Sequence, residues 1–481
     1  MESSSAELGV VGLGVMGRNL AYNIAGHGYA VTGFDKDADK VKIFCQEAED
    51  RPISCADDWE SFAKQLRAPR TLVLLVPAGQ AVDSVIRDAL PHLSPGDLII
   101  DGGNSFFHDT DLRERTLAER KVDFIGMGVS GGEYGALHGP SMMPGGPKDA
   151  FERIRPILEA ASAHVHGEPC IAYLGPRSAG HYVKMVHNGI EYGLMQLISE
   201  TYDLLRRGLR LSDSQLQTIY GNWNQTELNS YLLEITSNIF GESDDTGDAR
   251  LIDKILDSAK QKGTGKWTSQ DAMELGVPTP TIDAAVAMRN MSVLKIDREA
   301  ASEVLRGPAA SYSGPHEEFV ESLRRALYAS MIVTFTQGMA QLHAASEAYD
   351  YGLSLQTIAK IWRGGCIIRA ELLEEIRQAY ETRSDLPSLL LHDPLRNKVT
   401  AYEDDLRFVV GQGVALGIPV AALSASLAYF DAYRSAWLPA NLIQAQRDYF
   451  GAHTYERIDE KGDFHTQWEH PDAGVSVVTH A

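Results

Sequence analysis

The chain of 481 residues is too long for one ordinary hydrophobic core, so we expect two or three domains. Hydrophobic residues make up 44% and charged residues 23% of the sequence, which is typical of a water-soluble globular protein. The formal net charge of −21 argues against a nucleic-acid-binding protein, although a few local cations can still bind an anionic substrate.

Short β-rich segments alternate with longer helical segments from residue 8 to about residue 175. This alternation predicts an α/β domain over residues 1–179, with a mostly parallel sheet and helices on both faces. The predicted strands are Leu8–Val11, Ala30–Phe34, Thr71–Val76, Leu98–Ile100, Phe124–Ile125 and Ile171–Leu174.

The first predicted strand leads directly into a glycine-rich motif, Gly12-Leu13-Gly14-Val15-Met16-Gly17, and a helical segment follows. This order is typical of Rossmann-type dinucleotide-binding sites. Gly12 permits the tight turn, Gly14 lets the backbone approach a pyrophosphate, and Gly17 lets the helix pack closely on the strand. The free N–H groups of the helix N-terminus favour the phosphates. A role in the turn alone is the alternative, which the flanking strand and helix disfavour.

Asp35 ends the second predicted strand and bears on the choice of dinucleotide. A carboxylate at this place can accept hydrogen bonds from both adenosine ribose hydroxyls, and it repels a 2′-phosphate. Lys36 and Lys40 can offset part of that repulsion, unless they only form a solvated face. We therefore expect NAD or dual use, with strict dependence on NADP as the alternative.

Two polar loops follow predicted strand ends, Asp101-Gly-Gly-Asn104-Ser105 and Gly128-Val-Ser130-Gly131-Gly132-Glu133. Ligands bind outside the carboxyl ends of strands in open α/β sheets. Asn104 and Ser130 are thus placed to contact a polyol, and Gly131 and Gly132 offer backbone N–H groups. Ordinary turn chemistry is the alternative for each loop alone.

Long amphipathic segments dominate after residue 180 and predict an all-helical domain over residues 180–437. The predicted helices are His181–Arg207, Leu216–Asn238, Ile252–Lys262 and Pro315–Tyr351. A weak repeat, Glu200-Thr-Tyr-Asp203 with Gln217-Thr-Ile219 against Glu347-Ala-Tyr-Asp350 with Gln356-Thr-Ile358, indicates a helical duplication unless the matches arise by chance. Residues 438–481 form a polar and aromatic tail that we expect to pack against something else, with frayed residues beyond His470.

One predicted helix carries a polar cluster on a single face. Lys184, His187, Asn188 and Glu191 are spaced i, i+3, i+4 and i+7, while Val183, Val186 and Ile190 lie on the other faces. A salt-bridged surface helix explains the lysine and the glutamate, but not the histidine and asparagine between β-branched neighbours. A lysine partly removed from water has a lowered pKa and can act as a general base.

The four cysteines, Cys45, Cys55, Cys170 and Cys366, show no paired spacing, so we expect buried thiols in a reducing compartment. The first residues do not resemble a signal peptide, and no run of about 18 apolar residues predicts a membrane span. These features favour a cytoplasmic protein without a membrane or nucleic-acid partner.

The assembled motifs resemble those of the 6-phosphogluconate dehydrogenase family, over nearly the whole chain from Gly12 to His465. The matching blocks are Asp101–Asn104, Val129–Gly132, Gly180–Gly193, Lys262–Thr268 and Leu438–His453. The resemblance implies a dinucleotide-binding domain, a large duplicated helical domain, and a tail that inserts into the other subunit of a homodimer. It also implies oxidative decarboxylation of 6-phosphogluconate to ribulose 5-phosphate with NAD(P)+ and no metal.

The resemblance further implies roles for individual residues. Lys184 would be the general base, and Glu191 would be the acid that protonates carbon 1 of the enediol intermediate. Residues around the substrate carboxylate and hydroxyls would be Asn104, Ser130, Gly131, Gly132, His187 and Asn188. Residues at the phosphate would be Tyr192, Lys262, Arg289 and, from the partner subunit's tail, positions equivalent to Arg447 and His453.

Two segments depart from the family pattern, and both concern the cofactor. The family commonly has Asn-Arg-Thr after the second strand, where this chain has Asp35-Lys36-Asp37. The loop after the third predicted strand is commonly Val-Lys-Ala and here is Val76-Pro77-Ala78. Asn104 is expected at the cofactor as well as at the substrate. Two rivals remain: a non-decarboxylating β-hydroxyacid dehydrogenase, which is much shorter, and a catalytically silent dinucleotide-binding sensor.

Overall fold

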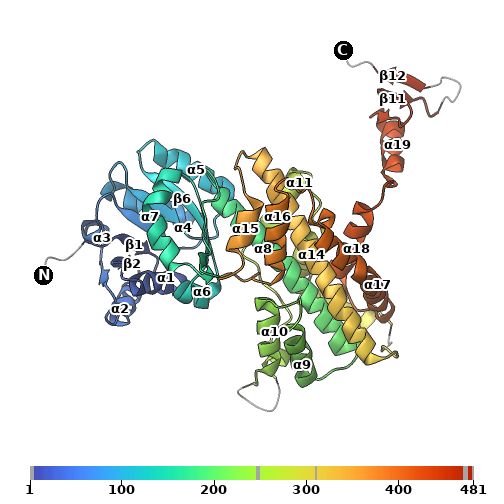
Figure 1. Ribbon diagram of the computed structural model, residues 1–481, viewed down its shortest axis with the longest axis horizontal. Helices are drawn as coiled ribbons and strands as arrows, with labels where there is room; N and C mark the ends of the chain where they lie inside the picture. Colours follow the sequence, from blue (N-terminus) through green and yellow to red (C-terminus); the bar gives the residue numbers. More distant parts are fainter. Residues whose placement is uncertain (1–4, 245–249, 309–310, 470–474, 479–481) are drawn as a thin grey trace. The chain divides into compact units, whose positions relative to one another are not determined.

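A seven-stranded sheet forms the first part of the chain, drawn in blue to cyan in Figure 1. The computed structural model describes residues 5–244, 250–308, 311–469 and 475–478. The strand order is β3-β2-β1-β4-β5-β6-β7, and neighbours are parallel except for the antiparallel pair β6 and β7. The strands are β1 Leu8–Val11, β2 Val31–Phe34, β3 Ile53–Cys55, β4 Thr71–Leu74, β5 Leu98–Asp101, β6 Asp123–Ser130 and β7 Ser141–Gly145.

Helices cover both faces of this sheet, as the alternating sequence predicts. Successive strand residues point to opposite faces, so Val10 packs with Leu20 and Phe151 while Val11 packs with Phe62 and Leu117. The two apolar clusters are the two halves of one layered core. The helices are α1 Val15–Gly26, α2 Ala38–Gln46, α3 Trp59–Gln65, α4 Gln80–Ala89, η1 Leu90–His92, α5 Phe107–Ala118, α6 Gly132–His138 and α7 Lys148–Ala161.

The predicted strand Ile171–Leu174 is wrong. Met142 N donates to Cys170 O at 3.0 Å and Leu174 N donates to Pro144 O at 3.0 Å, so this segment contacts β7 without forming a continuous ladder. Strands β3 and β7 were not predicted, because β3 has three residues and β7 contains Pro144 and Gly145. A short two-stranded hairpin, β8 His164–Val165 and β9 Glu168–Pro169, follows α7.

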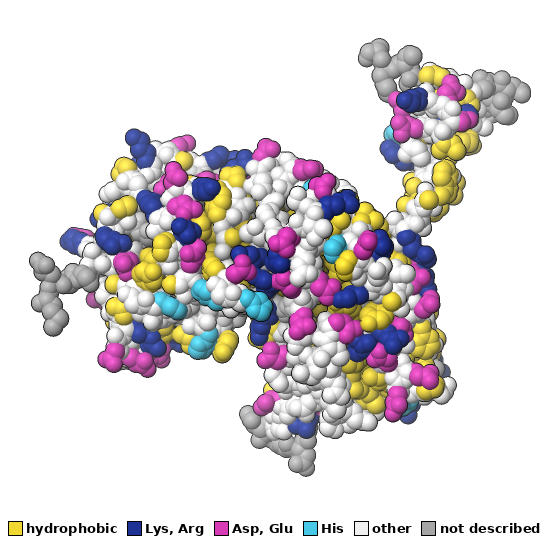
Figure 2. Space-filling model, viewed as in Figure 1, with side chains coloured by type: hydrophobic (Ala, Val, Ile, Leu, Met, Phe, Trp, Pro, Cys, Tyr) yellow, Lys and Arg dark blue, Asp and Glu magenta, His cyan; other side chains and the backbone are white. Residues whose placement is uncertain are grey.

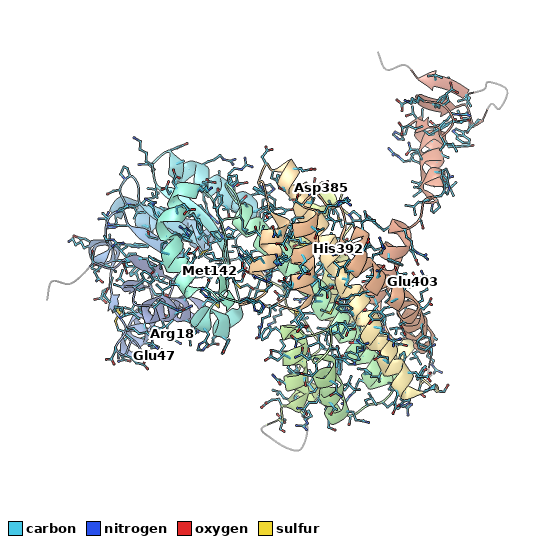
Figure 3. All side chains as sticks on the ribbon, in the orientation of Figure 1. Arg18, Glu47, Met142, Asp385, His392 and Glu403 are labelled. Carbon is cyan, nitrogen blue, oxygen red and sulfur yellow. A yellow bond between two sulfur atoms is a disulfide. The ribbon has the colours of Figure 1, made fainter. Side chains whose placement is uncertain are left out.

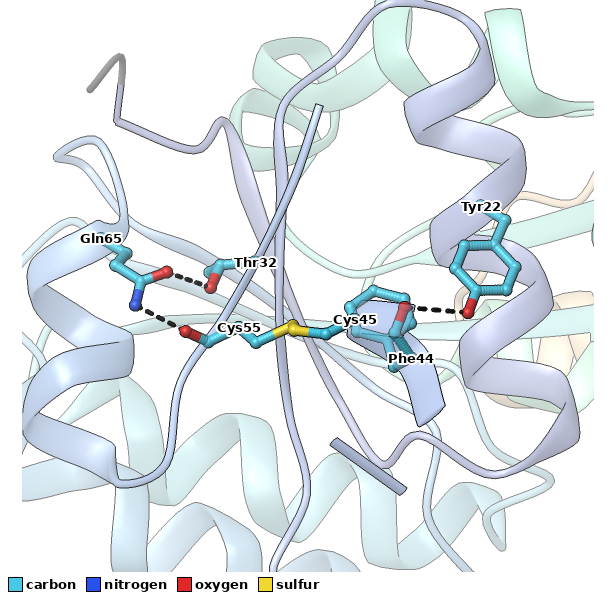
Figure 4. Close-up of a disulfide and its surroundings, with 6 residues drawn as sticks. All are labelled: Tyr22, Thr32, Phe44, Cys45, Cys55 and Gln65. Atoms are coloured by element: carbon cyan, nitrogen blue, oxygen red, sulfur yellow. Dashed lines mark hydrogen bonds between the residues drawn. A yellow bond between two sulfur atoms is a disulfide. The ribbon is translucent and has the colours of Figure 1, made fainter. Parts of the chain in front are cut away.

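The expectation of four unpaired cysteines is also wrong. Cys45, at the end of α2, and Cys55, in β3, form a disulfide with their Cα atoms 6.4 Å apart (Figure 4). That separation suits a disulfide, and a ten-residue spacing does not reveal it because the pair meets only after α2 packs beside β2. The ion pair of Arg18 and Glu47, 3.5 Å apart, also joins α1 to the end of α2 (Figure 3). Cys170 and Cys366 are buried free thiols, as expected.

The described residues between 179 and 433 are mainly helical, and α8 Ala179–Asp203 packs beside α14 His316–Ala348 (Figure 1). Each of these long helices leads through a turn to a shorter one, α9 Asp213–Trp223 or α15 Leu355–Ile361, which agrees with the predicted duplication. None of the described helices is long and apolar enough to cross a membrane. The other helical elements are η2 Leu204–Gly208, α10 Tyr231–Gly241, η3 Leu251–Lys254, α11 Thr264–Glu274, α12 Pro280–Val293, α13 Lys295–Val304, α16 Leu372–Thr382, η4 Leu389–Leu391, α17 Asp393–Leu416 and α18 Ala421–Tyr433.

Two of the predicted helices need correction. Leu216–Asn238 is split between α9 and α10, because Thr226 and Asn229 side chains bond to nearby backbone carbonyls and hold a turn there. Ile252–Lys262 is not a helix but a 3-10 turn followed by a loop. Its apolar side chains Ile255 and Leu256 are 58% and 65% exposed, so no buried face stabilises a helix in this unit.

The chain divides into two compact units, Met1–Leu427 and Ala428–Ala481. In the second, α19 Ala440–Gly451 is followed by the strands β10 Tyr455–Glu456, β11 Asp463–Thr466 and β12 Val475–Val478. The buried Asp448 carboxylate fastens α19 to these strands, since it accepts from Thr454 N, His465 Nδ1, Thr466 N and Trp468 Nε1. The expected fraying beyond His470 is wrong for β12, which pairs with β11, and the other residues of that stretch lie outside the described ones.

Candidate active site

The glycine motif forms the turn that the sequence predicts. Gly12 has φ +96°, and a Cβ at Gly17 would lie 1.9 Å from Gly12 O, so neither position has room for a side chain. A Cβ at Gly14 would meet nothing within 4 Å, so the backbone at the start of α1 faces open space. Free N–H groups at a helix start with open space before them fit the pyrophosphate of a dinucleotide.

Asp35 lies directly beside this motif, with its side chain 9% exposed. Its Oδ2 accepts from Leu13 N at 2.8 Å, and its Oδ1 accepts from Asp37 N at 3.0 Å. A carboxylate has about four acceptor positions, so two remain for a ribose diol. Lys40 Nζ lies 3.9 Å from Asp35 and 3.7 Å from Asp37, which identifies Lys40 rather than the exposed Lys36 as the paired cation.

The loop after β5 presents Asn104, which is exposed. The buried Asp101 carboxylate shapes the loop, because it accepts from Gly103 N at 3.0 Å and from Ser105 Oγ at 2.6 Å. Arg113 Nη1 lies 3.5 Å from the same carboxylate and neutralises it. Strand β4 lies between β1 and β5, and the loop that follows it contains Val76, Pro77 and Ala78. Pro77 and Ala78 are exposed.

Helix α8 crosses β6 at very short distance, and glycines make this possible. A Cβ at Gly128 would lie 2.3 Å from Lys184 Cβ, and a Cβ at Gly126 would lie 2.8 Å from His181 Nδ1. A Cβ at Gly180 would lie 2.2 Å from Met143 O and 2.3 Å from Gly126 O. The stem of Lys184 therefore lies on the backbone of β6, two residues before Ser130.

The predicted polar face forms one connected cluster. Asn188 Nδ2 donates to Thr264 Oγ1 at 3.1 Å, which leaves its carbonyl oxygen to accept from His187 Nδ1 at 3.1 Å. His187 Nε2 then accepts from the hydroxyl of Ser130 at 3.3 Å. Lys184 Nζ lies 3.4 Å and Glu191 Oε2 3.9 Å from His187 Nδ1. The structure thus brings together five of the predicted residues from α8 and β6.

The ionisation of this cluster is shifted by burial. Burial lowers the pKa of the Lys184 amine, against the opposing effect of Glu191. Burial raises the pKa of the Glu191 carboxyl, against Lys184 and Arg289. Burial and the nearby Lys184 lower the pKa of His187, which keeps that imidazole neutral. A lowered pKa of the amine and a raised pKa of the carboxyl suit a general base and a general acid.

A cationic region lies one turn further along α8. Arg289 stacks 3.4 Å over the centroid of the Tyr192 ring, and burial lowers the pKa of its guanidinium. Lys262 is exposed and immediately precedes Gly263, the residue before α11. A Cβ at Gly265 would lie 2.4 Å from the Tyr192 ring, so the start of α11 lies against this region. Arginine, lysine and a helix N-terminus are groups that recognise phosphate.

Gly131 and Gly132 begin α6 with φ of +109° and +61°. Gly131 lies against the turn after α15, since a Cβ there would be 2.6 Å from Gly365 O. Arg447 and His453 belong to the second compact unit, and each is described only within it. Arg447 Nη1 donates to Gln444 Oε1 at 3.2 Å, and the His453 ring contacts that of Phe450.

Comparisons with known proteins match both halves of the chain. The family model for the NAD binding domain of 6-phosphogluconate dehydrogenase matches residues 7–175, and that for its C-terminal domain matches residues 180–468. The chain belongs to the 6-phosphogluconate dehydrogenase family. The rival assignment to the shorter β-hydroxyacid dehydrogenases is thereby set aside.

Individual relatives agree with this family over nearly their full length. The chain is 52% identical to the NADP(+)-dependent, decarboxylating 6-phosphogluconate dehydrogenase of Bacillus subtilis, over 97% of this chain and 99% of that one. It is 50% identical to the decarboxylating enzyme of Lactococcus lactis subsp. lactis, over 97% and 99%. The solved Plasmodium falciparum 6-phosphogluconate dehydrogenase is 43% identical and superimposes with a TM-score of 0.92 over 96% of this chain and 100% of that chain.

The sequence did not identify two residues that organise the site, Thr264 in the polar cluster and Arg113 beneath the Asn104 loop. Thr264 was part of a matched block but was not assigned to the site, although its hydroxyl contacts Asn188. Its place just after Gly263, at the start of a helix, was the available signal. Arg113 was missed because nothing in its sequence neighbourhood indicates a contact with Asp101.

Proposed function

We propose that this protein catalyses the oxidative decarboxylation of 6-phosphogluconate to ribulose 5-phosphate and carbon dioxide, with NAD(P)+ as hydride acceptor. The family of the chain and the conjunction of a buried lysine with a partly buried glutamate around His187 support this function. The solved Plasmodium relative was studied with NADP+ and with 6-phosphogluconate. We further propose a cytoplasmic location from the metabolic reaction of the family; the cysteines no longer support it, because Cys45 and Cys55 form a disulfide.

Lys184 acts as the general base in this proposal. Its amine, whose pKa burial lowers, takes the proton of the 3-hydroxyl of the substrate. The bound dinucleotide supplies the acceptor for the hydride that leaves carbon 3. The resulting 3-keto acid loses carbon dioxide, because its ketone is β to the carboxylate and accepts the electrons of the breaking bond between carbons 1 and 2. Protonated Lys184 polarises that carbonyl oxygen, so the step needs no metal.

Glu191 acts as the acid for the last step. Decarboxylation leaves an enediol, and carbon 1 must receive a proton to give ribulose 5-phosphate. The raised pKa of the Glu191 carboxyl keeps a proton available for this transfer. Glu191 lies one turn beyond His187 on α8, and Lys184 lies about one turn before it. The acid and the base are therefore separated along the helix, and they act on different carbons of the substrate.

The remaining predicted residues bind the substrate. We assign the carboxylate and hydroxyls to Asn104, Ser130, Gly131, Gly132, His187 and Asn188, and the phosphate to Tyr192, Lys262, Arg289, Arg447 and His453. Thr264 joins this set through Asn188. The test is to add 6-phosphogluconate and NAD(P)+ while recording nicotinamide absorbance and carbon dioxide. Reduction without carbon dioxide release would support a non-decarboxylating dehydrogenase, and no reduction would support a silent sensor.

The cofactor proposal is that NAD is used at least as well as NADP. Asp35 keeps two acceptor positions for the ribose diol, and its carboxylate would meet a 2′-phosphate at short range. Lys40 is already shared between Asp35 and Asp37, so it neutralises two carboxylates before any phosphate arrives. The residues proposed to contact the dinucleotide are Gly12, Leu13, Gly14, Val15, Met16, Gly17, Asp35, Lys36, Asp37, Val76, Pro77, Ala78 and Asn104.

An Asp35→Asn substitution is expected to shift the ratio of kcat/KM for NAD to that for NADP by about tenfold or more toward NADP. The amide removes the like charge, and its NH2 group replaces one carboxylate oxygen, so at that place it can accept neither from the backbone N–H nor from a ribose hydroxyl. Asp37→Asn is the matched control, since it removes the same charge from the residue that caps α2. If the ratio of kcat/KM shifted equally in both variants, the net charge of the region, and not the contact with the ribose, would determine the cofactor preference. A wild-type ratio that favours NADP about a hundredfold would overturn the proposal.

We also propose that the protein is a homodimer with active sites shared between subunits. Both compact units expose apolar side chains that a monomer leaves in water: Ile296, Val304 and Leu305 in the first are 73–81% exposed, and Leu442, Ile443 and Phe450 in the second 60–73%. Figure 2 shows apolar side chains on the surface of α19. Large apolar side chains exposed in this way favour a protein interface. The phosphate-binding Arg447 then comes from the partner's tail.

Mixing Arg447→Ala subunits with Lys184→Met subunits is expected to restore activity. Random exchange gives hybrid dimers in which one of the two sites has both native residues, so about one quarter of wild-type activity should return. The measurement is the rate after subunit exchange, which labelled subunits verify independently. Two inactive proteins that stay inactive after verified exchange would contradict shared sites.

A further inference from the structure

His181 precedes Lys184 by one turn of α8 and is fully buried at 1% exposure. The two residues lie over Gly126 and Gly128, which are themselves two residues apart on the same face of β6. The helix and the strand therefore meet in register, with the histidine at one contact and the catalytic lysine at the next. None of the steps proposed above uses this histidine.

The hydrogen bonds of His181 fix its tautomer. Nε2 lies 3.0 Å from the backbone oxygen of Asp101, which can only accept, so Nε2 carries the hydrogen. Nδ1 must then accept, and the hydroxyl of Thr110 donates to it at 2.6 Å. Burial lowers the pKa of this imidazole, which agrees with a neutral ring. The ring thus joins three elements: α8, the end of β5, and α5.

Asp101 connects this ring to the loop that presents Asn104. Its backbone oxygen holds His181, while its side chain holds Gly103 N and Ser105 Oγ on either side of Asn104. The bond from His181 to Asp101 O thus connects α8 directly to the residue that shapes the loop. His181 therefore adds a hydrogen-bonded link between α8 and the Asn104 loop to the glycine packing that already seats Lys184 on β6.

We propose that His181 is a positioning residue that holds Lys184 in register with the Asn104 loop, so that base, substrate and hydride acceptor are aligned. The inference rests on the proposed function, because Lys184 and Asn104 are its reacting and binding groups. His181 touches neither substrate nor dinucleotide in this scheme. Its effect is on the geometry of the oxidation step, and small misplacements of reacting groups can cost about 10²-fold in rate.

The test compares His181→Phe, which keeps an aromatic ring without hydrogen bonds, with Thr110→Val, which removes the hydroxyl that bonds to Nδ1 at 2.6 Å and to Phe106 O at 3.4 Å. Both are normalised to the number of dinucleotide-binding sites in a fluorescence titration, so misfolded protein does not count. We expect kcat to fall about tenfold or more in His181→Phe and about threefold in Thr110→Val, with KM for 6-phosphogluconate within about twofold. His27→Phe, an exposed histidine at the end of α1, is the control and should match wild type.

The deciding readout is the isotope effect with substrate deuterated at carbon 3. Misalignment makes hydride transfer more rate-limiting, so the effect on kcat should rise in both variants. An unchanged isotope effect and an unchanged kcat per binding site in His181→Phe would overturn the proposal, as would a change in KM alone. Wild-type enzyme run in parallel separates the two inferences: failure of wild type to oxidise 6-phosphogluconate would overturn the proposed function and this proposal with it.

Discussion

A Lys184→Met enzyme is expected to fold and to bind the dinucleotide, yet to lose oxidation by about 10²–10⁴-fold. The lysine stem lies against β6 within van der Waals reach of Gly128, and methionine fills the same narrow space. The substitution removes only the amine that takes the 3-hydroxyl proton. Turnover of 6-phosphogluconate, measured by nicotinamide absorbance at saturating cofactor, within about tenfold of wild type would rule out Lys184 as the base.

Two further variants test whether Lys184 acts by transferring a proton or only by its positive charge. Lys184→Arg keeps a cation but cannot supply a neutral base, so it should be as inactive as the methionine variant. An active Lys184→Arg enzyme would show that positive charge alone suffices. Lys148→Met, at the exposed start of α7, removes a lysine far along the chain from the cluster and should keep full activity.

Glu191→Gln is expected to slow the formation of ribulose 5-phosphate by about 10²-fold or more while binding of the substrate changes little. The amide has nearly the shape of the acid, but it has no proton to give to carbon 1. The measurement is the rate and the stereochemistry with which deuterium from the solvent enters carbon 1 of the product, ribulose 5-phosphate. A variant that labels this carbon as fast and as stereospecifically as wild type would exclude Glu191 as the acid.

The pH profile offers a matched check on this pair. Lys184 must be neutral, so kcat/KM falls as the pH drops below the lowered pKa of its amine. Glu191 must be protonated, so the rate falls again as the pH rises above the raised pKa of its carboxyl. Glu191→Asp retains an acid and should keep an alkaline limb, whereas Glu191→Gln should lose it. An unchanged alkaline limb in Glu191→Gln would assign that limb to another group.

The sequence predicts those parts of this fold whose physics is local. The glycine motif needs only its own turn and helix, and the spacing of Lys184, His187 and Glu191 fixes them to one helical face whatever surrounds it. The layered sheet also follows, because β1, β2, β4 and β5 are short apolar segments between helices. Tertiary contacts then bring Ser130 and Thr264 to the same face from β6 and α11.

What the sequence does not predict depends on contacts between distant segments. Strand β7 contains a proline and a glycine, and only its antiparallel pairing with β6 makes it a strand. The Cys45–Cys55 bridge appears only when α2 lies beside the sheet. The roles of Arg113 and His181 likewise arise from Asp101, which lies far from the latter in the sequence.

At the glycines where β6 and α8 meet, even a substitution by alanine is expected to affect catalysis. At Gly180 the obstacle to a side chain is backbone, Met143 O and Gly126 O, so no rotamer change can relieve it. At Gly128 the obstacle is the stem of Lys184 itself. One added methyl group at either position would displace the base instead of merely loosening the core. Substitutions at these two glycines are therefore expected to impair catalysis although glycine has no reactive side chain. Variants found there should be grouped with active-site variants, even when the protein remains folded.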